Sequence, residues 1–528
     1  MNKKIILIIT IFTLIGLFFH FFKINQVPPC LNADELAFSY NSYSLLKTGK
    51  DEFGKILPLR LTSFGDYKLP LLSYLNIPLI MIFGLEKATS LKLVNGFILI
   101  LYPFILYLFV NQLFSSFQIA LLSTFLFSIS WIVHSFSRQL HEALLTSFLL
   151  VIVSYFFLIN LKKRKIVFEF LFNLFLLLSL FSYHSSRIFG LFFLFLEIIL
   201  LIKKKISFRF LIITLITIVL FSITDFIYKP TRVNNLLFFN NQGFVNKINE
   251  SIKNGGSRIL YNKLSIGIKE VAFEYLKYFS PQFLVVEGDL NLRFGNSGMS
   301  PLNLIEYFFF FIGIYYLFHK KEKHRFFLVS LLLISPLPGA LSWAGLSVSR
   351  TFFIFIVLII IGSYGWVNFW RQNSLNNFNF NLIKIVIVAV FIFFSILNWD
   401  YYLNQYPKSW LNQQAWQCGY KELVNYVKIN YHRFDKFYIT KESGPPYIFF
   451  LYYLKYPPEK FQKQASLGKI DQYGFAQVEN FDKFVFNLNY PQNKKNVVIV
   501  GRPLEIPEEE VKKIYFNNQE IFWIKEGK

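Results

Sequence analysis

Residues 28–70 read PPCLNADELAFSYNSYSLLKTGKDEFGKILPLRLTSFGDYKLP and carry charged groups between strongly apolar stretches of the chain. Asp34 and Glu35 lie near the start of this run, shortly after the first hydrophobic segment, and Asp66 and Lys68 lie near its end. Because hydrocarbon does not solvate charge, these side chains must face water or bind a charged partner. The run therefore predicts a polar loop at a membrane surface. Paired acids beside a lysine are typical of a site that acts on a lipid-linked anion.

The composition is that of a polytopic membrane protein. Of the 528 residues, 54% are hydrophobic, only 16% are charged and 67 are phenylalanine, which is more apolar material than a soluble domain of this size can bury. The formal net charge of +23 does not indicate nucleic-acid binding, because the lysines form short clusters between apolar runs. We therefore expect no nucleic-acid partner.

Eleven apolar runs are long enough, or nearly so, to cross a bilayer, whose core requires about 20 helical residues. The first run follows two lysines and lacks a small-residue cleavage site, so we expect an uncleaved signal anchor. The eleven runs are Ile5–Phe22, Leu91–Val110, Ile119–Val133, Ala143–Leu161, Phe168–Ser182, Ile188–Ile202, Phe208–Ile227, Leu304–Phe318, Phe326–Leu341, Phe352–Trp370 and Leu382–Leu397.

Basic clusters fix the expected orientation, because short loops rich in Lys and Arg stay in the cytoplasm. They predict a cytoplasmic amino terminus and an extracytoplasmic carboxyl terminus. The apolar segment Leu69–Leu85 contains two prolines, and counting it as a span would put the basic clusters on opposite sides. We therefore expect a helix along the outer surface there. The clusters are Lys3-Lys4, Lys162–Lys165, Lys203–Lys205 with Arg209, and His319–Arg325.

With this orientation, the charged residues that could carry chemistry gather on the outer side. The orientation is derived from other residues, so this convergence favours a site at the outer surface. The residues are Asp34, Glu35, Asp66, Lys68, Arg138, His141, Glu142, His184, Arg187, Asp289, Arg293 and Arg350.

The hydropathy falls after Leu397, and we expect a small extracytoplasmic α/β domain over residues 400–528. The transmembrane domain then covers residues 1–399, with outer loops at 23–90 and 229–302. In the small domain, Trp416–Tyr431 has helical spacing, Asn517-Asn518 is the expected turn of a closing hairpin, and the expected strands are Phe437–Thr440, Phe484–Phe486, Val497–Val500, Lys513–Phe516 and Glu520–Lys525.

Two features of the outer segments remain open. Cys30 and Cys418 are too few for a disulfide scaffold, but both fall on the outer side, so a single bridge between them is one of two alternatives. The glycine-rich turns Asn254–Ser257 and Gly295–Gly298 in the second loop are typical of a lid over a site.

The acidic pair Asp34 and Glu35 is the candidate general base. Burial at a partly dehydrated interface raises the pKa of a carboxyl group, which suits it to deprotonate an acceptor hydroxyl. Lys68, at the start of the expected interfacial helix, is a candidate phosphate ligand. The alternatives are a solvated loop carboxylate and a snorkelling lysine. The recurrence of Asp66 and Lys68 in one loop favours function.

Arginines at the ends of three predicted spans are candidates for binding a phosphate group by forked hydrogen bonds. Arg187 follows His184 closely, and Arg350 precedes a long apolar run. Arg138 and Glu142 are four residues apart and are expected on one helical face, where they either form an ion pair or line a polar cavity. For Arg187 and Arg350 the alternative is contact with lipid headgroups.

No nucleotide-binding, dinucleotide or zinc motif is present in the chain. The residues that instead occur in a known combination are Asp34-Glu35, Lys68-Leu69-Pro70, Ser137-Arg138 with Glu142, His184–Arg187, Gly288–Arg293, and Arg350 after Pro336–Gly339. Over Met1–Trp399 the chain thereby resembles the bacterial C-type membrane glycosyltransferases, close to protein O-mannosyltransferases and lipid A aminoarabinose transferases. It departs from them where Leu69 precedes Pro70 and where Ser347 stands in place of a histidine.

The resemblance implies a multi-pass protein of the bacterial plasma membrane that moves a hexosyl or pentosyl group from a polyprenyl-phosphate donor. The acceptor would be a hydroxyl group of a glycan, lipid or protein on the outer face, and transfer would invert the sugar in one step. The implied catalytic residues are Asp34, Glu35 and Asp66, the donor-phosphate ligands are Lys68, Arg138, Arg187 and Arg350, and the other substrate-binding residues are His141, Glu142, His184, Asp289 and Arg293.

The sequence requires no cofactor, but Asp34 and Glu35 carry oxygen ligands that would suit Mg²⁺ or Mn²⁺. The main alternative function is a transporter or flippase of a lipid-linked or anionic substrate, which would have charged or broken helices at mid-membrane and often an internal repeat. A non-catalytic envelope protein is a third possibility. Membrane lipids are expected partners in every case.

Overall fold

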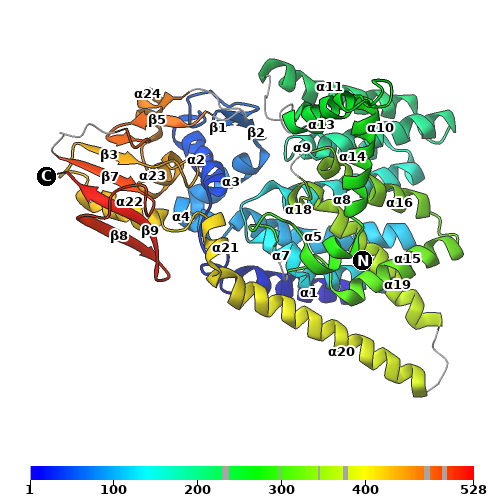
Figure 1. Cartoon of the computed structure of the whole chain (residues 1–528). Helices are drawn as coiled ribbons and strands as arrows, with labels where there is room; N and C mark the ends of the chain where they lie inside the picture. The colour runs from blue at the N-terminus through cyan, green and yellow to red at the C-terminus, as the bar shows by residue number, and fades with distance from the viewer. Residues whose placement is uncertain are drawn as a thin grey trace. The chain divides into compact units, whose positions relative to one another are not determined.

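The fold is that of a mostly helical protein with a strand-rich carboxyl-terminal part (Figure 1). A computed structural model describes residues 2–228, 237–295, 299–342, 345–372, 378–468, 476–489 and 496–527. The chain divides into two compact units. The first contains Met1–Phe22, Asn95–Lys229 and Val233–Leu403, and the second contains Lys23–Val94 and Asn404–Lys528.

The first unit is a bundle of apolar helices. Among them, α15 packs along α19, and α8 packs along α9. The helices are α1 (Lys3–Phe21), α5 (Leu93–Phe114), α6 (Phe117–Ile129), α7 (Trp131–Ser137), α8 (Glu142–Lys163), α9 (Ile166–Leu180), α10 (Ser186–Ile202), α11 (Phe208–Tyr228), α13 (Gln242–Lys253), α14 (Lys263–Lys277), α15 (Leu304–His319), α16 (Arg325–Ile334), α17 (Leu337–Ala340), α18 (Val348–Thr351), α19 (Phe353–Gln372) and α20 (Phe378–Asp400).

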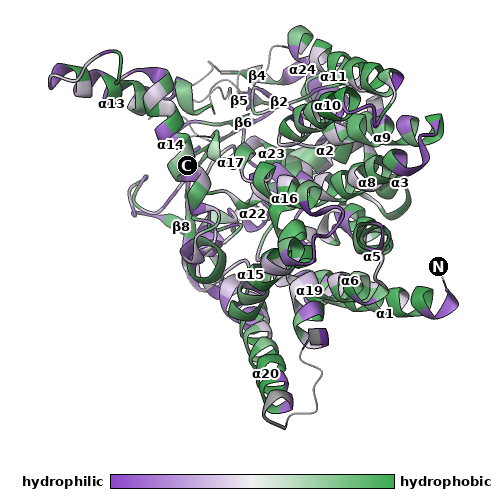
Figure 2. Ribbon diagram, turned by 90° about the vertical axis from the view of Figure 1, so that its right-hand side faces the viewer, coloured by the Kyte–Doolittle hydropathy of each residue, from purple (hydrophilic) through white to green (hydrophobic). Residues whose placement is uncertain are grey.

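Six helices of the described residues are long and apolar enough to cross a membrane, and the bent pair α6–α7 would make a seventh. Four more apolar helices are shorter. Figure 2 shows the hydrophobic residues along these helices. Each of the eleven predicted spans overlaps a described helix, so the multi-pass helical class is confirmed, while the number eleven stays a prediction. The predicted interfacial segment is one of the shorter apolar helices, α3 (Leu71–Phe83).

The second unit contains a sheet of seven strands in the order β4-β5-β6-β3-β7-β9-β8, drawn from yellow-orange to red in Figure 1. β3 runs parallel to β6 and β7, and the other neighbours are antiparallel. The strands are β3 (Lys436–Ile439), β4 (Ser466–Leu467), β5 (Val478–Phe481), β6 (Phe484–Val485), β7 (Val497–Gly501), β8 (Val511–Phe516) and β9 (Gln519–Glu526).

The predicted elements of this part are present. β8 and β9 join at Asn517 and Asn518, which have φ angles of 46° and 64°, as a tight hairpin turn requires. The predicted helix begins four residues late, as α22 (Tyr420–Asn430), because Gly419 with φ of 96° interrupts the chain before it. A short helix, α21 (Trp410–Ala415), precedes this break.

The first loop after α1 belongs to the same unit as the sheet, which differs from the division at residue 399 that the sequence predicted. Its helix α2 (Ala33–Thr48) packs against α23 (Tyr447–Tyr453) and α24 (Pro458–Gln464). The Tyr40 hydroxyl donates to the Tyr456 carbonyl at 2.9 Å. The loop therefore packs as part of the carboxyl-terminal core.

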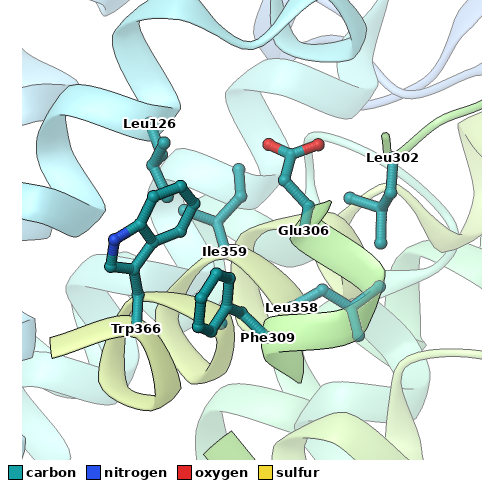
Figure 3. Close-up of a pocket in the computed structure, with 8 residues that line it drawn as sticks. Leu126, Leu302, Glu306, Phe309, Leu358, Ile359 and Trp366 are labelled. Carbon is teal, nitrogen blue, oxygen red and sulfur yellow. The ribbon is translucent and has the colours of Figure 1, made fainter. Parts of the chain in front are cut away.

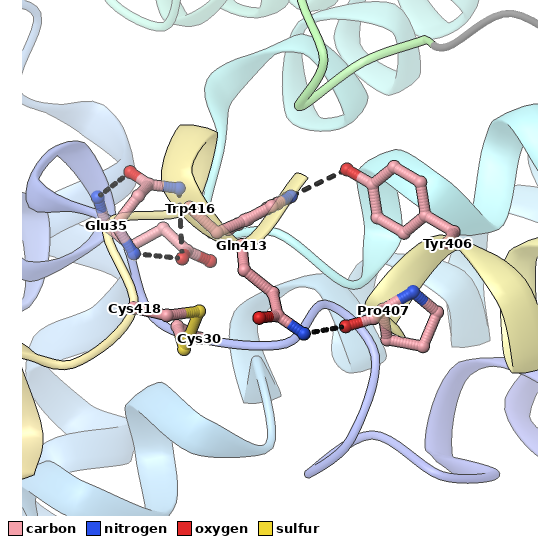
Figure 4. Close-up of a disulfide and its surroundings, with 8 residues drawn as sticks. Cys30, Glu35, Tyr406, Pro407, Gln413, Trp416 and Cys418 are labelled. Atoms are coloured by element: carbon pink, nitrogen blue, oxygen red, sulfur yellow. Dashed lines mark hydrogen bonds between the residues drawn. A yellow bond between two sulfur atoms is a disulfide. The ribbon is translucent and has the colours of Figure 1, made fainter. Parts of the chain in front are cut away.

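A disulfide joins the two segments of this unit. Cys30 and Cys418 are bonded, with their Cα atoms 5.4 Å apart, although 388 positions separate them in the chain. Beside the bridge, the Trp416 indole donates to the Tyr406 hydroxyl at 2.6 Å (Figure 4). The sequence had left this pairing open.

Candidate active site

The first turn of α2 is fixed by its own capping residues and by the carboxyl-terminal segment. Asn32 Oδ1 accepts the backbone N–H groups of Asp34 and Glu35, and Glu35 Oε2 accepts the N–H of Asn32 at 3.1 Å. The Ala33 N–H donates to Gln417 Oε1 at 2.9 Å. Gln417 lies next to the disulfide, so the turn that carries both acids is held from two sides.

The two acids of this turn have different surroundings. Glu35 is buried, and Lys92 Nζ lies 2.6 Å from its Oε1, with both side chains at most 3% exposed. Asp34 is 42% exposed and accepts a hydrogen bond of 2.8 Å from Lys68 Nζ. Of the pair, Asp34 is therefore the carboxylate that a substrate can reach.

Lys68 reaches Asp34 from the end of a short hairpin. The hairpin joins β1 (Leu61–Ser63) to β2 (Asp66–Lys68). Its turn residues Phe64 and Gly65 have φ angles of 56° and 73°. The Lys68 ammonium lies over the Phe38 and Phe64 rings, 4.7 and 4.9 Å from their centroids. These contacts hold the cation in place beside the carboxylate.

Asp66, the third predicted catalytic acid, is buried in the same hairpin at 3% exposure. The tip of the hairpin contacts the rest of the unit, because the Ala476 N–H donates to the Phe64 carbonyl at 3.0 Å and the Phe64 N–H donates to Tyr447 Oη at 3.3 Å. The structure thus brings Asp34, Lys68 and Asp66 into one loop assembly, in which Asp34 is the exposed acid.

A further buried acid in this unit was not singled out from the sequence. Glu52 is fully buried, and it accepts hydrogen bonds from the Tyr447 hydroxyl at 2.8 Å and from Asn41 Nδ2 at 3.1 Å. Burial raises the pKa of Glu52 to about 8. Glu52 lies in a polar run of the sequence, and nothing in the sequence signals its burial.

The predicted phosphate-binding arginines lie in the first unit, and two of them are already occupied. Arg138 is fully buried and donates to the carbonyl groups of Phe19 and Phe22 at 2.9 and 2.8 Å, at the end of α1. Arg187 makes two contacts of 3.1 Å with the carboxylate of Asp225. These arrangements stabilise helix ends and helix pairs.

Arg350 lies in a different environment, next to the predicted substrate residue Asp289. The Val348 N–H donates to Asp289 Oδ2 at 2.7 Å. Burial raises the pKa of Asp289 to about 6, and the charges of Arg350 and Arg293 act in the opposite direction. Arg350 Nη1 donates to Ser342 Oγ at 2.6 Å. This group combines a cation with a buried acid at the start of the long helix α19.

The remaining predicted residues do not form one cluster with Arg138. Arg138 ends α7 and Glu142 begins α8, so the expectation that they share one helical face is wrong. His141 lies between them and caps α8, where its Nδ1 accepts the Ala143 N–H at 3.1 Å. His184 lies in the turn before α10.

The candidate residues thus fall into two sets, which are described separately. The second unit holds Asp34, Glu35, Asp66 and Lys68, and the first unit holds Arg138, His141, Glu142, His184, Arg187, Asp289, Arg293 and Arg350. Part of the expected lid, residues 296–298, lies outside the described residues.

A pocket in the first unit contains one acid that the sequence did not single out (Figure 3). Glu306 faces apolar side chains there, including Phe309 and Trp366. Its Oε2 accepts the Asn303 N–H at 2.9 Å in the capping box that begins α15. This bond gives the carboxyl group a role in starting the helix.

Asp34 and Glu35, the residues proposed to bind a metal ion, each contact a lysine side chain. The Asp34 and Glu35 carboxylates are each bound by a lysine, and within the described ranges no three His, Cys, Asp or Glu side chains gather as a metal site. In each pair the ammonium group lies 2.6–2.8 Å from one oxygen of the carboxylate. An Mg²⁺ or Mn²⁺ ion on these residues stays a prediction.

Comparisons with known proteins give a likeness of fold. No family model matches the chain, and no curated protein is similar to it in sequence. The structure is similar to ArnT from Cupriavidus metallidurans in the apo state, with 9% identity, a TM-score of 0.54, and coverage of 98% of this chain and 97% of that one.

A second ArnT structure from the same organism, bound to undecaprenyl phosphate, gives 9% identity, a TM-score of 0.50 and coverage of 99% and 98%. The oligosaccharyltransferase AglB from Archaeoglobus fulgidus, in complex with an inhibitory peptide and a dolichol-phosphate, gives 13% identity and a TM-score of 0.48 over 85% of this chain. The chain spans 63% of the length of AglB. The fold of this protein is thus similar to that of ArnT, in agreement with the multi-pass helical fold that the resemblance of its sequence implies.

Proposed function

We propose that this protein is a membrane glycosyltransferase that moves a sugar from a polyprenyl-phosphate donor to an acceptor hydroxyl on the outer face of the membrane. The observation that carries the proposal is the exposed Asp34 carboxylate beside Lys68, on a helix start that is fixed from both sides. An ArnT structure bound to undecaprenyl phosphate supports the class of donor.

Asp34 acts as the general base. It takes the proton of the acceptor hydroxyl while the hydroxyl oxygen attacks the anomeric carbon, and the bond between that carbon and the phosphate oxygen breaks. The phosphate leaves with the bonding electrons, and nearby cations stabilise its charge. A single displacement of this kind inverts the anomeric carbon. Lys68 holds the carboxylate in one orientation through the 2.8 Å contact.

Glu35 positions Asp34 and does not act as the base. Its carboxylate is buried, closes the capping box with Asn32 and is paired with Lys92. A carboxylate with these partners is poorly accessible to an acceptor hydroxyl. Asp66 is also buried, and we assign it to the hairpin.

Arg350 is the best candidate for the donor phosphate. It lies in α18, just before the start of α19, and donates to the Ser342 hydroxyl, which a phosphate oxygen can displace. Arg138 and Arg187 are engaged by two carbonyl groups and by a carboxylate. We therefore assign these two arginines to the stability of the bundle.

The second candidate function is transport of a lipid-linked or anionic substrate. One observation favours it: the helix pair α6–α7 is bent by 56° at a short break, and broken helices are frequent in transporters. In a transporter Asp34 would influence substrate movement without forming a glycosidic bond. The two functions therefore differ in their products.

The test is transfer from a panel of radiolabelled polyprenyl-phosphate sugars in membranes that contain the full-length protein. The proposal expects labelled acceptor with wild type and at least about a 100-fold loss with Asp34→Asn. Glu508→Gln, which neutralises an exposed acid remote in sequence from the site, should leave transfer unchanged. Labelled sugar that crosses the membrane without a new glycosidic bond would support the transporter and overturn the proposal.

A further inference from the structure

Helices α13 and α14 form a hairpin whose inner side packs within the first unit. Phe244 and Ile248 of α13 are buried, and the Phe244 ring lies 4.5 Å from that of Phe238, centroid to centroid. On α14, Gly267 faces Phe239 so closely that an added Cβ would collide with the ring. Lys247 and Glu270 form an ion pair between the two helices. One face of α14 is therefore committed to protein contacts.

Another face of α14 carries large apolar side chains that are exposed. Leu264 and Ile268, one helical turn apart, are 69% and 60% exposed. Ile259 and Leu260, just before the helix, are 83% and 66% exposed. These four residues, all between positions 259 and 268, form an apolar surface of the kind that marks an interaction site. We call Ile259, Leu260, Leu264 and Ile268 the apolar edge.

The carboxyl-terminal end of α14 is hydrogen-bonded to other parts of the helical first unit. The Tyr275 hydroxyl donates to the Leu333 carbonyl at 2.7 Å, and Leu333 itself is a half-exposed residue of the apolar helix α16. The next residue after α14, Tyr278, accepts the Ser347 N–H at 2.9 Å. α14 thus adjoins the apolar surface of a helix that is expected to contact lipid.

Basic side chains accompany the apolar edge. Arg258, Lys263 and Lys269 are exposed and lie next to its members in the chain. Between Gln242 and Lys277 the chain has six basic and three acidic residues. An amphipathic segment with large apolar side chains on one face and lysines or arginines beside them is typical of a helix that lies in the headgroup region of a bilayer.

From these observations we propose that the α13–α14 hairpin lies on the membrane surface, with its apolar edge among the acyl chains and Arg258, Lys263 and Lys269 on anionic lipid headgroups. The occupant of the apolar edge is the bilayer, because the edge adjoins lipid-facing helix surface and has cations on its flanks. This gives the second loop an anchoring role and differs from the mobile lid that its glycines indicate.

The test is the depth of a spin label attached to the full-length protein in liposomes with anionic lipid. Both cysteines of the chain are in the disulfide, so Ile268→Cys provides one reactive thiol. If residue 268 lies in the bilayer, the spin label should collide more often with dissolved oxygen, which concentrates among the acyl chains, than with a water-soluble nickel chelate. Leu215→Cys on the exposed side of α11 is the lipid reference, and Asn249→Cys on the exposed side of α13 is the water reference.

A label at residue 268 that behaves like the one at residue 249 would overturn the proposal. So would shielding that develops only after polyprenyl phosphate is added, which would indicate the donor lipid, or only at high protein density, which would indicate a second copy. In a second measurement, Lys263→Gln with Lys269→Gln should make the label at residue 268 shallower in anionic liposomes. An equal depth would contradict the headgroup contact. Lys428→Gln with Lys436→Gln, at two exposed lysines of the other unit, is the charge-matched control.

Discussion

Asp34 and Glu35 are adjacent on the first turn of α2, but they have separate tasks in this account. Asp34 is exposed and is held by Lys68, whereas Glu35 is buried against Lys92. A buried ion pair is costly to break, because the remaining charge loses its partner in a medium that solvates it poorly. This difference gives a test of which acid does the chemistry.

Glu35→Gln should destabilise the protein by about 3–5 kcal/mol, the usual cost of removing one partner of a buried pair. Transfer per folded molecule should fall far less than in Asp34→Asn. Thermal unfolding in detergent and transfer assays on the same preparations would measure both effects. If Glu35→Gln folded as well as wild type but lost all transfer, Glu35 would be the base.

Glu52 makes the stability of the second unit depend on pH. Its pKa in the folded state is about 8 because of burial, well above the ordinary value, so the folded state binds a proton that the unfolded state has released. Between about pH 5 and pH 8 the free energy of unfolding therefore decreases as the pH rises, by up to about 1.4 kcal/mol per pH unit.

Glu52→Gln should remove this part of the pH dependence. The variant should gain in melting temperature relative to wild type as the pH is raised from 5 to 9. Differential scanning fluorimetry at several pH values would measure the gain. A difference in melting temperature that is the same at every pH would contradict the burial of an ionisable group at this position.

Among the secondary-structure elements, the β1–β2 hairpin positions Lys68 beside Asp34. Its tip is the critical part, because Gly65 has φ of 73° and an added Cβ would meet the backbone nitrogen of Ala476. Gly49, at the end of α2, has a similar φ of 69° but no atom within 4 Å of an added Cβ. A comparison of alanine substitutions at the two glycines therefore distinguishes the effect of backbone strain from that of steric collision.

Gly65→Ala should be more harmful than Gly49→Ala. Both variants should lose about 1 kcal/mol through the strained backbone, but only Gly65→Ala should also move the hairpin and lower the transfer rate. Melting temperature and transfer rate of the two variants, measured side by side, would decide this. Equal loss of transfer in both would mean that the hairpin tip does not control the site.

For the whole molecule, the disulfide joins the loop that carries Asp34 to the carboxyl-terminal segment. Cys418→Ser should lower stability by about 2–5 kcal/mol, as is usual when a native bridge is removed, and should reduce transfer because the turn before α2 is released. Cys30→Ser with Cys418→Ser should match the single variant. Unchanged melting temperature and transfer in reducing buffer would contradict this positioning role.

Much of the fold could be predicted from the sequence. Hydropathy located the helices that match the predicted spans, and alternation with the Asn517-Asn518 turn located the last strands. The packing of α2 onto α23 and α24 could not be predicted, because it depends on contacts between segments hundreds of residues apart. The break between α7 and α8 was missed because four-residue spacing cannot distinguish one helix from two short helix ends.

The sequence was sufficient to identify charged residues as candidates for the site. It was less informative about the role of each residue. Asp34 with Lys68 and Arg350 with Asp289 are brought together as charged neighbours. Burial separates Glu35, Glu52 and Arg138 from solvent, and burial of a charged residue depends on its tertiary partners. No local pattern contains that information.

The roles of Asp34 as general base and Arg350 as phosphate ligand are tested most directly by steady-state kinetics. Transfer by Asp34→Asn and Arg350→Ala would be measured against the concentration of the polyprenyl-phosphate sugar. We expect Asp34→Asn to lower kcat at least about 100-fold with little change in KM for the donor. Arg350→Ala should mainly raise KM for the donor, by about 10-fold or more. A normal kcat in Asp34→Asn would contradict the assignment of Asp34 as the general base, because the base would then lie elsewhere.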